Sequence, residues 1–269
     1  MLSRSLARLA LLVLPVLTAC FQSSTLVKLN PDGSGTIEQT TTISAQALSQ
    51  LESFGTMGGK DKKDAGSDPF SIDEAKTAAP KMGEGVTFVS GDRIDTPDHK
   101  GLRAVYAFTD IRKLSLREMN APAGADVGGK PSQPMSLAFA QLPNGHALLT
   151  IKNDTDLNKA GATAKTEAAG TPFGGMDQKQ AMEMMKAMFA GMKIDFAIQV
   201  GHVVKTNVPY VSGGTVTLLS MDFDQVLSNP AALEQMEKAQ SLDDARVALK
   251  GVKGIKVTLD PELTIEFTK

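Results

Sequence analysis

Hydrophobic and polar residues alternate with a period of two along much of this chain. Such alternation is typical of half-buried antiparallel strands, whose side chains point in turn to the core and to solvent. The pattern predicts strands over Thr25–Asn30, Thr36–Ser44, Gly85–Ser90, Leu102–Ile111, Met135–Leu142, His146–Asn153, Lys193–Val200 and Gly214–Met221, and a last pair over Ile255–Asp260 and Glu262–Phe267.

Helix-start signals separate some of these strands. The four predicted helices begin after the cap residues Ser71, Asp177, Asn229 and Ser241. Three of these caps are followed at the third position by Glu, Gln or Asp, as in a capping box, and Pro follows Asn229. Hairpins interleaved with short helices predict an α+β fold, in which an antiparallel, curved sheet of hairpins carries several short helices packed on one face.

Three segments break the pattern, at residues 55–69, 122–134 and 158–175. They are rich in Gly, Ala, Lys and Pro and poor in apolar residues, so burial cannot offset the cost of ordering them. We therefore predict mobile loops there, within a single α+β domain over residues 25–269.

The stretch "NPDGSGTIE", Asn30 to Glu38, allows two interpretations. It places oxygen-bearing side chains and a Gly at the spacing of a calcium-binding EF-hand loop. However, Thr41 stands at the twelfth position, where the loop requires a bidentate acid, and the flanking residues favour strands rather than helices. Asp32-Gly33 is also a strong turn signal, so we predict a hairpin turn without calcium.

The start of the chain carries the most specific signal. Arg4 and Arg8 precede an apolar run over Leu9–Leu17, which has the length of a signal peptide and is too short to span a bilayer. The following "LTAC", which ends at Cys20, resembles the lipobox of bacterial lipoproteins. The resemblance implies a cleaved signal peptide over residues 1–19, acyl chains on Cys20 and a lipidated tether over residues 20–24. The alternative is an ordinary signal peptide with a chance cysteine.

Composition narrows the protein's surroundings and partners. Cys20 is the only cysteine, which excludes an intramolecular disulfide and a cysteine-ligated zinc site. Loss of Arg4 and Arg8 would move the formal net charge from −2 to −4, so we expect no nucleic-acid partner. We expect membrane attachment through the N-terminal acyl chains, on the extracytoplasmic side of a bacterial envelope. Because no Asp follows Cys20, the outer membrane is the expected site in a Gram-negative host.

Motifs for catalysis or phosphate binding are incomplete. Residues 124–131, "GADVGGKP", match P-loop spacing except that Pro131 replaces the magnesium-binding Ser or Thr. The three histidines are His99, His146 and His202, far apart in the sequence and in turn or strand-edge contexts. Asp222 and Asp224 could form a carboxylate pair, although a helix N-cap also explains one of them. We therefore expect no catalytic residue, no metal-binding residue and no cofactor.

The predicted helix over residues 178–192 is rich in methionine, with Met182, Met185, Met188 and Met192 at steps of three and four. An apolar stripe with this spacing is typical of a face packed into the core. Methionine also adapts to irregular apolar ligands, and its thioether binds Cu(I). Core packing, contact with an apolar ligand or lipid, and copper binding all fit the sequence.

The order of several segments resembles the LppM-type bacterial lipoproteins. The matching pieces are Cys20, "VKLNPDGSGTIEQT" at residues 27–40, "GVTFVS" at 85–90 and "VGHVVKTNVPYVSGGTVTL" at 200–218. The resemblance implies a mixed α+β envelope domain that binds lipid or another apolar ligand, and it transfers no catalytic residue. We expect a non-enzymatic, lipid-anchored envelope protein that binds an apolar or lipid-like ligand or an envelope protein partner. The alternatives are a structural or protein-interaction lipoprotein without a small ligand, and a hydrolase.

Overall fold

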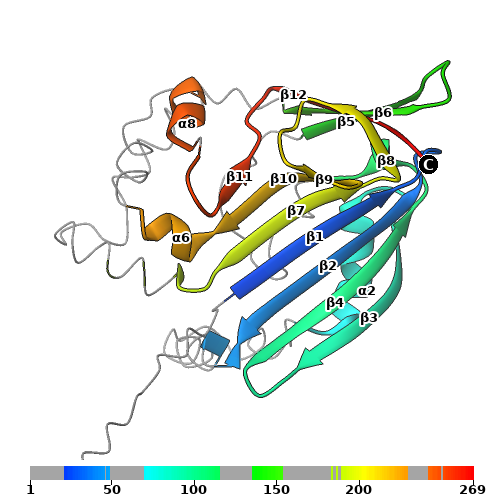
Figure 1. Ribbon diagram of the computed structural model, residues 1–269. Coiled ribbons are helices and arrows are strands. Elements are labelled where there is room, and N and C mark those ends of the chain that lie inside the picture. Colours follow the sequence, from blue (N-terminus) through cyan, green and yellow to red (C-terminus); the bar gives the residue numbers. More distant parts are fainter. Residues whose placement is uncertain are drawn as a thin grey trace, which may run out of the picture.

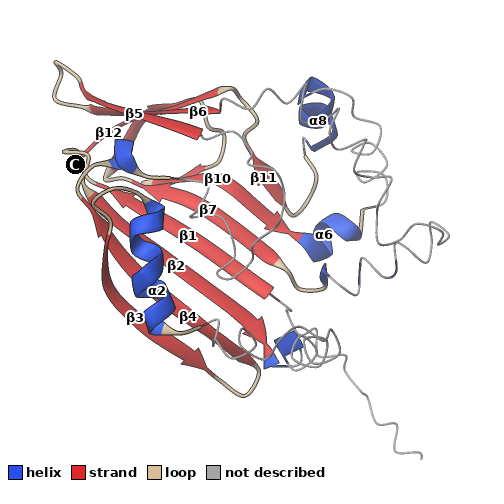
Figure 2. Ribbon diagram, turned by 180° about the vertical axis from the view of Figure 1, so that it is seen from behind, coloured by secondary structure: helices blue, strands red, loops and turns tan. Residues whose placement is uncertain are grey.

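Two β-sheets make up most of the structure. The computed structural model describes residues 21–45, 47–48, 70–115, 135–153, 183, 186, 189–229, 242–249 and 251–269, which form a mainly β arrangement with a few short helices (Figures 1 and 2). The larger sheet has the order β11-β10-β7-β1-β2-β4-β3, with β9 paired to β10. Its strands are β1 (Phe21–Leu29), β2 (Gly35–Ser44), β3 (Thr87–Asp95), β4 (His99–Phe108), β7 (Lys193–Gln199), β9 (Val211–Ser212), β10 (Thr215–Asp222) and β11 (Ile255–Val257).

The smaller sheet has the order β5-β6-β12-β8 and is antiparallel throughout. Its strands are β5 (Met135–Gln141), β6 (Ala147–Asn153), β8 (His202–Thr206) and β12 (Glu262–Thr268). The β5–β6 hairpin turns at Asn144-Gly145, with Gly145 at φ +80°, as the sequence predicts.

The expected single antiparallel, curved sheet is wrong in two respects. The strands divide between two sheets, and neither sheet closes or curls (Figure 1). Moreover, β1 pairs in parallel with β7, from Gln22 opposite Lys193 to Lys28 opposite Gln199, so the larger sheet is mixed. Alternating side chains show that a segment is a strand, but they do not specify which distant strand lies beside it.

The hairpin interpretation of the first turn is confirmed. β1 and β2 are antiparallel on either side of residues 30–34, and Gly33 has a φ of +87°. Asp32 Oδ1 accepts hydrogen bonds from the backbone N–H of Ser34 (2.9 Å) and from its hydroxyl (2.7 Å). These hydrogen bonds lower the pKa of Asp32. The carboxylate therefore closes the turn, where a calcium loop would direct it at an ion.

The core lies between one face of the larger sheet and the smaller sheet. Val27, Ile37 and Ile198 from the larger sheet belong to the same buried cluster as Ile265 and Phe267 from β12. The opposite face of the larger sheet carries exposed polar residues along β1 and β7, namely Ser24, Lys28, Lys193, Asp195 and Gln199. Because side chains alternate along each strand, the inner face builds the core and the outer face remains available for contacts.

Short helices flank the sheets. The helices are α2 (Ile72–Ala78), α6 (Phe223–Leu227) and α8 (Leu242–Leu249), with 3₁₀ turns η1 (Ala79–Met82) and η2 (Ile111–Lys113). Helix α2 begins after Ser71, whose hydroxyl accepts the N–H of Asp73, and it lies across the inner face beside β3 and β4 (Figure 2). No helix in the described ranges is long and apolar enough to cross a membrane.

Several predictions lie outside the described residues. They are the signal peptide over residues 1–19, Cys20, the near P-loop at 124–131, the loops at 55–69, 122–134 and 158–175, and the helix after Asn229. Of the methionine-rich segment 178–192, only Glu183, Lys186 and residues 189–192 are described. The expected tether over residues 20–24 differs from the structure, because Phe21–Ser24 already belong to β1.

Candidate functional site

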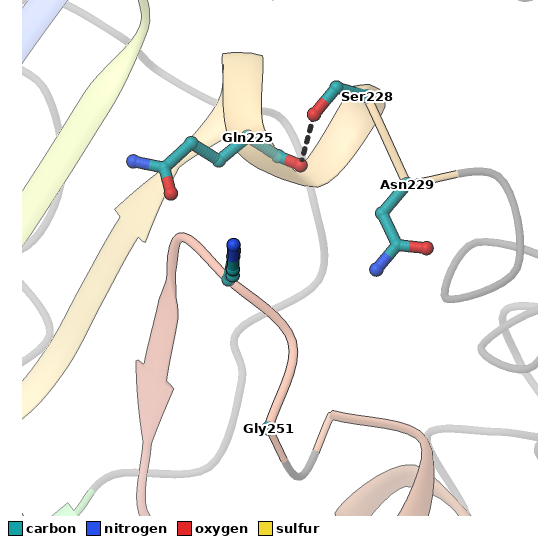
Figure 3. A pocket seen from close by; sticks show the side chains of 5 residues that line it. Gln225, Ser228, Asn229 and Gly251 are labelled. Carbon is teal, nitrogen blue, oxygen red and sulfur yellow. Dashed lines mark hydrogen bonds between the residues drawn. The ribbon is translucent and has the colours of Figure 1, made fainter.

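A cleft lies where β7, β10 and β11 meet α6 and the loop over residues 251–254. Its volume is about 630 Å³, within the usual range for small-ligand sites. A second hollow of about 410 Å³ adjoins it, and the two share Gln225, Gly251 and Lys253. Figure 3 shows the second hollow, with Gln225, Ser228 and Asn229 on one side and Gly251 on the other.

The first part of the cleft is built at the junction of β7, β10 and α6. Lys193 begins β7 and lies opposite Asp222, the last residue of β10, and Lys193 Nζ is 3.1 Å from Asp222 Oδ2. Asp222 is also the N-cap of α6, since its carboxylate accepts the N–H of Gln225 (3.3 Å) and the side-chain amide of Gln225 (3.0 Å). Burial raises the pKa of Asp222, but the hydrogen bonds from Gln225 and Lys193 outweigh it and leave the pKa below 3.8.

The loop from Gly251 to Gly254 forms the opposite side. Both glycines have positive φ, +78° and +86°, and the backbone N–H of Asp222 donates to the Gly254 carbonyl at 2.7 Å. A Cβ on Gly254 would lie only 2.5 Å from Gln225 Cβ, so the loop approaches α6 this closely only because residue 254 is glycine. This approach places Lys253 beside the β10–α6 junction.

Apolar side chains also line the cleft. Met221, Val252 and Ile255 contribute to it, and Val252 and Ile255 are buried in a small hydrophobic cluster together with Val226. The cleft is therefore amphipathic, with charged and amide groups beside an apolar cluster. This combination suits a ligand that carries both a charged group and apolar atoms.

The free charges of the cleft are mainly cationic. Lys193 and Asp222 neutralise each other, and Asp195 is exposed two residues further along β7. Lys253 and Lys256 are exposed and form no ion pair with any residue in the described ranges. Among the described residues, the cleft thus holds two ammonium groups and one carboxylate without an ion-pair partner, which favours an anionic group on the ligand.

The structure separates the candidate residues of the sequence. Asp222 caps α6 as the cap interpretation predicts, whereas Asp224 Oδ1 accepts the N–H of Gly191 at 2.8 Å, so the two carboxylates have different partners. His146 Nδ1 lies 2.7 Å from Glu266 Oε1, and this contact lowers the pKa of Glu266. The pair joins the turn before β6 to β12.

The other two histidines begin separate strands, His99 in β4 and His202 in β8. Within the described ranges, no group of three or more His, Cys, Asp or Glu side chains could hold a metal ion.

The cleft lysines have no local sequence signal. Lys193 begins a strand, Lys253 lies in a turn and Lys256 lies in a short edge strand, and only the pairing of β7, β10 and β11 brings them together. The one available hint was the cap pattern at Asp222, together with Gly251 as a helix stop. Both mark the borders of the cleft without indicating its charge.

Comparison with known proteins gives one likeness. No family model matches this chain, and no curated protein matches it. Among solved structures, the chain is similar to the folded domain of the LppM protein of Mycobacterium tuberculosis, determined by NMR. The TM-score is 0.36 and the identity 11%, over 94% of this chain and 92% of that chain. A likeness at this level assigns no role to any residue of the cleft.

Proposed function

We propose that this protein is a non-enzymatic, lipid-anchored protein of the bacterial cell envelope that binds a lipid-like ligand in the cleft. The observation that carries the proposal is the lining of the cleft, which includes the exposed Lys253 and Lys256, the half-buried Met221, and the buried Val252 and Ile255. A lipid-like molecule presents a charged headgroup and apolar carbons within a short distance, which matches this lining. The anchor follows from the lipobox-like residues that end at Cys20.

The contacts of the cleft favour binding over catalysis. A hydrolase needs a nucleophile in hydrogen-bonding contact with a base. Ser220 and Tyr210 are the hydroxyl-bearing residues that line the larger cleft, and neither side chain has a hydrogen bond to a base among the described residues. This arrangement supports a binding role for the cleft.

The proposal is tested by the lipids that copurify with the protein. The acylated protein would be extracted from membranes as wild type, as the double variant Lys253→Gln with Lys256→Gln, and as a control, Lys81→Gln with Lys205→Gln. The control removes the same charge from exposed lysines outside the cleft. Mass spectrometry of the bound lipids should find an amphiphile with wild type and control and several-fold less with the cleft variant. Equal lipid in all three samples, or none, contradicts the ligand.

The anchor has a separate measurement. The mass of the N-terminal peptide of the mature protein should show acyl chains on Cys20. A chain that begins elsewhere, or an unmodified Cys20, contradicts the anchor. A protein partner recovered by crosslinking in place of a lipid would favour the interaction role.

A further inference from the structure

One end of the larger sheet is defined by the start of β1, and we call it the anchor end. Phe21 pairs with Ile43 near the end of β2, and Gln22 lies opposite Lys193 at the start of β7. The start of β4 and the turn between β3 and β4 lie at the same end, because Ser44 pairs with His99. Figure 1 shows the start of β1, the end of β2, the β3–β4 turn and α6 at this end.

β1 begins at the residue that follows the lipobox cysteine, without a linker between them. Cys20 directly precedes Phe21, and adjacent Cα atoms are about 3.8 Å apart. Phe21 is already hydrogen-bonded into the sheet as a strand residue. Acyl chains on Cys20 would therefore hold the anchor end within about one residue of the membrane surface, where a flexible tether would leave the domain free to turn.

The cleft belongs to the anchor end. Lys193 lies opposite Gln22, which is two residues from Cys20, and Asp222 lies opposite Lys193 on the next strand. Ile255 pairs with Met221, so the loop that carries Lys253 lies at this end as well. The two exposed lysines of the cleft are thus at the end of the molecule that the anchor would hold at the bilayer.

We propose that the anchor end stands on the membrane surface and that the cleft binds the phosphate-bearing headgroup of an anionic phospholipid from that same membrane. This inference rests on the proposed function and adds the orientation of the domain and the class of ligand. Lys253 and Lys256 pair with the headgroup phosphate, and the half-buried Met221 lies beside its glycerol and upper acyl carbons, above the buried Val252 and Ile255. Lysines near an anionic bilayer each strengthen binding by about fivefold.

Two matched reporters test the orientation. Pro97 lies in the β3–β4 turn at the anchor end, and Pro143 lies in the β5–β6 turn at the opposite end. The opposite position of Pro143 follows from Gln141, whose side-chain amide donates to the Pro31 carbonyl at the tip of the β1–β2 hairpin (3.4 Å). Because Cys20 is the only cysteine, Pro97→Cys and Pro143→Cys each introduce a single free thiol into the acylated protein.

The reporters would be labelled with a fluorophore, and the full acylated protein reconstituted into nanodiscs with spin-labelled lipid. The expected result is strong quenching at position 97 and little at position 143. Equal quenching at both positions, or the reverse order, overturns the orientation. The mass of the Cys20 peptide from the same sample separates the two proposals: an acylated protein with unquenched position 97 contradicts only the orientation.

The headgroup is tested by crosslinking in the same nanodiscs. Phosphatidylglycerol with a photoreactive headgroup should crosslink to residues 251–256 of the wild type and of the Lys81→Gln, Lys205→Gln control. The Lys253→Gln, Lys256→Gln variant should keep only about one twenty-fifth of this yield, since two lysines at about fivefold each are removed. An unchanged yield in the cleft variant, or equal yield from a phosphatidylcholine probe, overturns the assignment of an anionic phospholipid.

Discussion

At the scale of single residues, close packing explains positions that the hydrophobic pattern treats as equivalent. Gly35 begins β2 in an extended conformation, yet a Cβ there would lie 2.0 Å from the Lys28 carbonyl oxygen and 2.6 Å from Phe108 Cζ. Gly33, and not Gly35, has the left-handed backbone conformation of this turn. The need for glycine at position 35 arises from neighbours on β1 and β4, which the local sequence does not reveal.

Gly35→Ala should therefore lower the free energy of unfolding by about 3 kcal/mol, because backbone atoms must move to admit the methyl group. Gly213→Ala is the control, since Gly213 has a φ of +57° but no atom within 4 Å of its Cβ position. Its cost should be only about 1 kcal/mol, from the left-handed backbone alone. Urea denaturation of both variants measures the difference, and equal losses would contradict the steric explanation.

Glu38 connects three strands on the outer face, and its charge gives the fold a pH dependence. Its carboxylate accepts a hydrogen bond from Arg103 Nε (2.9 Å) and lies 3.4 Å from Lys28 Nζ. The hydrogen bond from Arg103 is the main cause that lowers the pKa of Glu38 from 4.5. A carboxyl whose pKa is lower in the folded state stabilises the fold above its unfolded pKa, and this contribution is lost as the pH falls through its folded pKa.

The stability difference between wild type and Glu38→Gln should therefore be largest at neutral pH and shrink as the pH falls below about 4.5. Urea denaturation at a series of pH values from 7 to 3 measures it. Arg103→Gln removes the donor of the same hydrogen bond and should show the same trend. A difference that stays constant over this pH range would show that Glu38 acts through packing rather than through its charge.

At the scale of elements, local signals predicted most of the described strands and two of the hairpins, but they missed β8 and placed β11 and β12 in one pair, although these strands belong to different sheets. Asp32-Gly33 and Asn144-Gly145 mark the β1–β2 and β5–β6 turns, and Ser71 marks the start of α2. The parallel contact between β1 and β7 has no such signal, because a long stretch of chain separates the two strands. The cleft depends on this contact and on the β7–β10–β11 pairing, so its lysines could not be assembled from the sequence alone.

Helix α6 offers an element-scale test, because Asp222 serves both its cap and the Lys193 ion pair. Asp222→Ala removes both and should lower the free energy of unfolding by about 1 kcal/mol. Asp222→Asn keeps an acceptor for the Gln225 N–H and should cost less. Hydrogen exchange of the Gln225 amide should accelerate more in Asp222→Ala than in Asp222→Asn, and similar rates would show that the ion pair, rather than the cap, holds α6.

At the scale of the whole molecule, the direction of β1 relates the two sheets to the proposed anchor. The strand starts one residue after Cys20 and leads to the hairpin tip, where Gly33 meets Phe139 of the smaller sheet. At about 3.3 Å per residue, the nine residues of β1 span about 30 Å. The part of the smaller sheet that contacts the hairpin tip would thus lie about that far from the bilayer. The cleft, in contrast, lies close to the bilayer.

A flexible linker inserted between Cys20 and β1 tests whether their direct connection orients the domain. Insertion of eight Gly and Ser residues directly after Cys20 adds a flexible segment with a mean reach of about 16 Å. The effective concentration of headgroups at the cleft falls as the domain gains freedom to turn. Phosphatidylglycerol crosslinking should therefore fall several-fold, and the quenching difference between positions 97 and 143 should shrink. The melting temperature and the acyl mass on Cys20 should not change.

The same eight residues added after Lys269 are the control and should alter none of these readouts. If the insertion after Cys20 leaves both crosslinking and quenching unchanged, then contacts of the domain itself, rather than the short connection, hold it on the membrane.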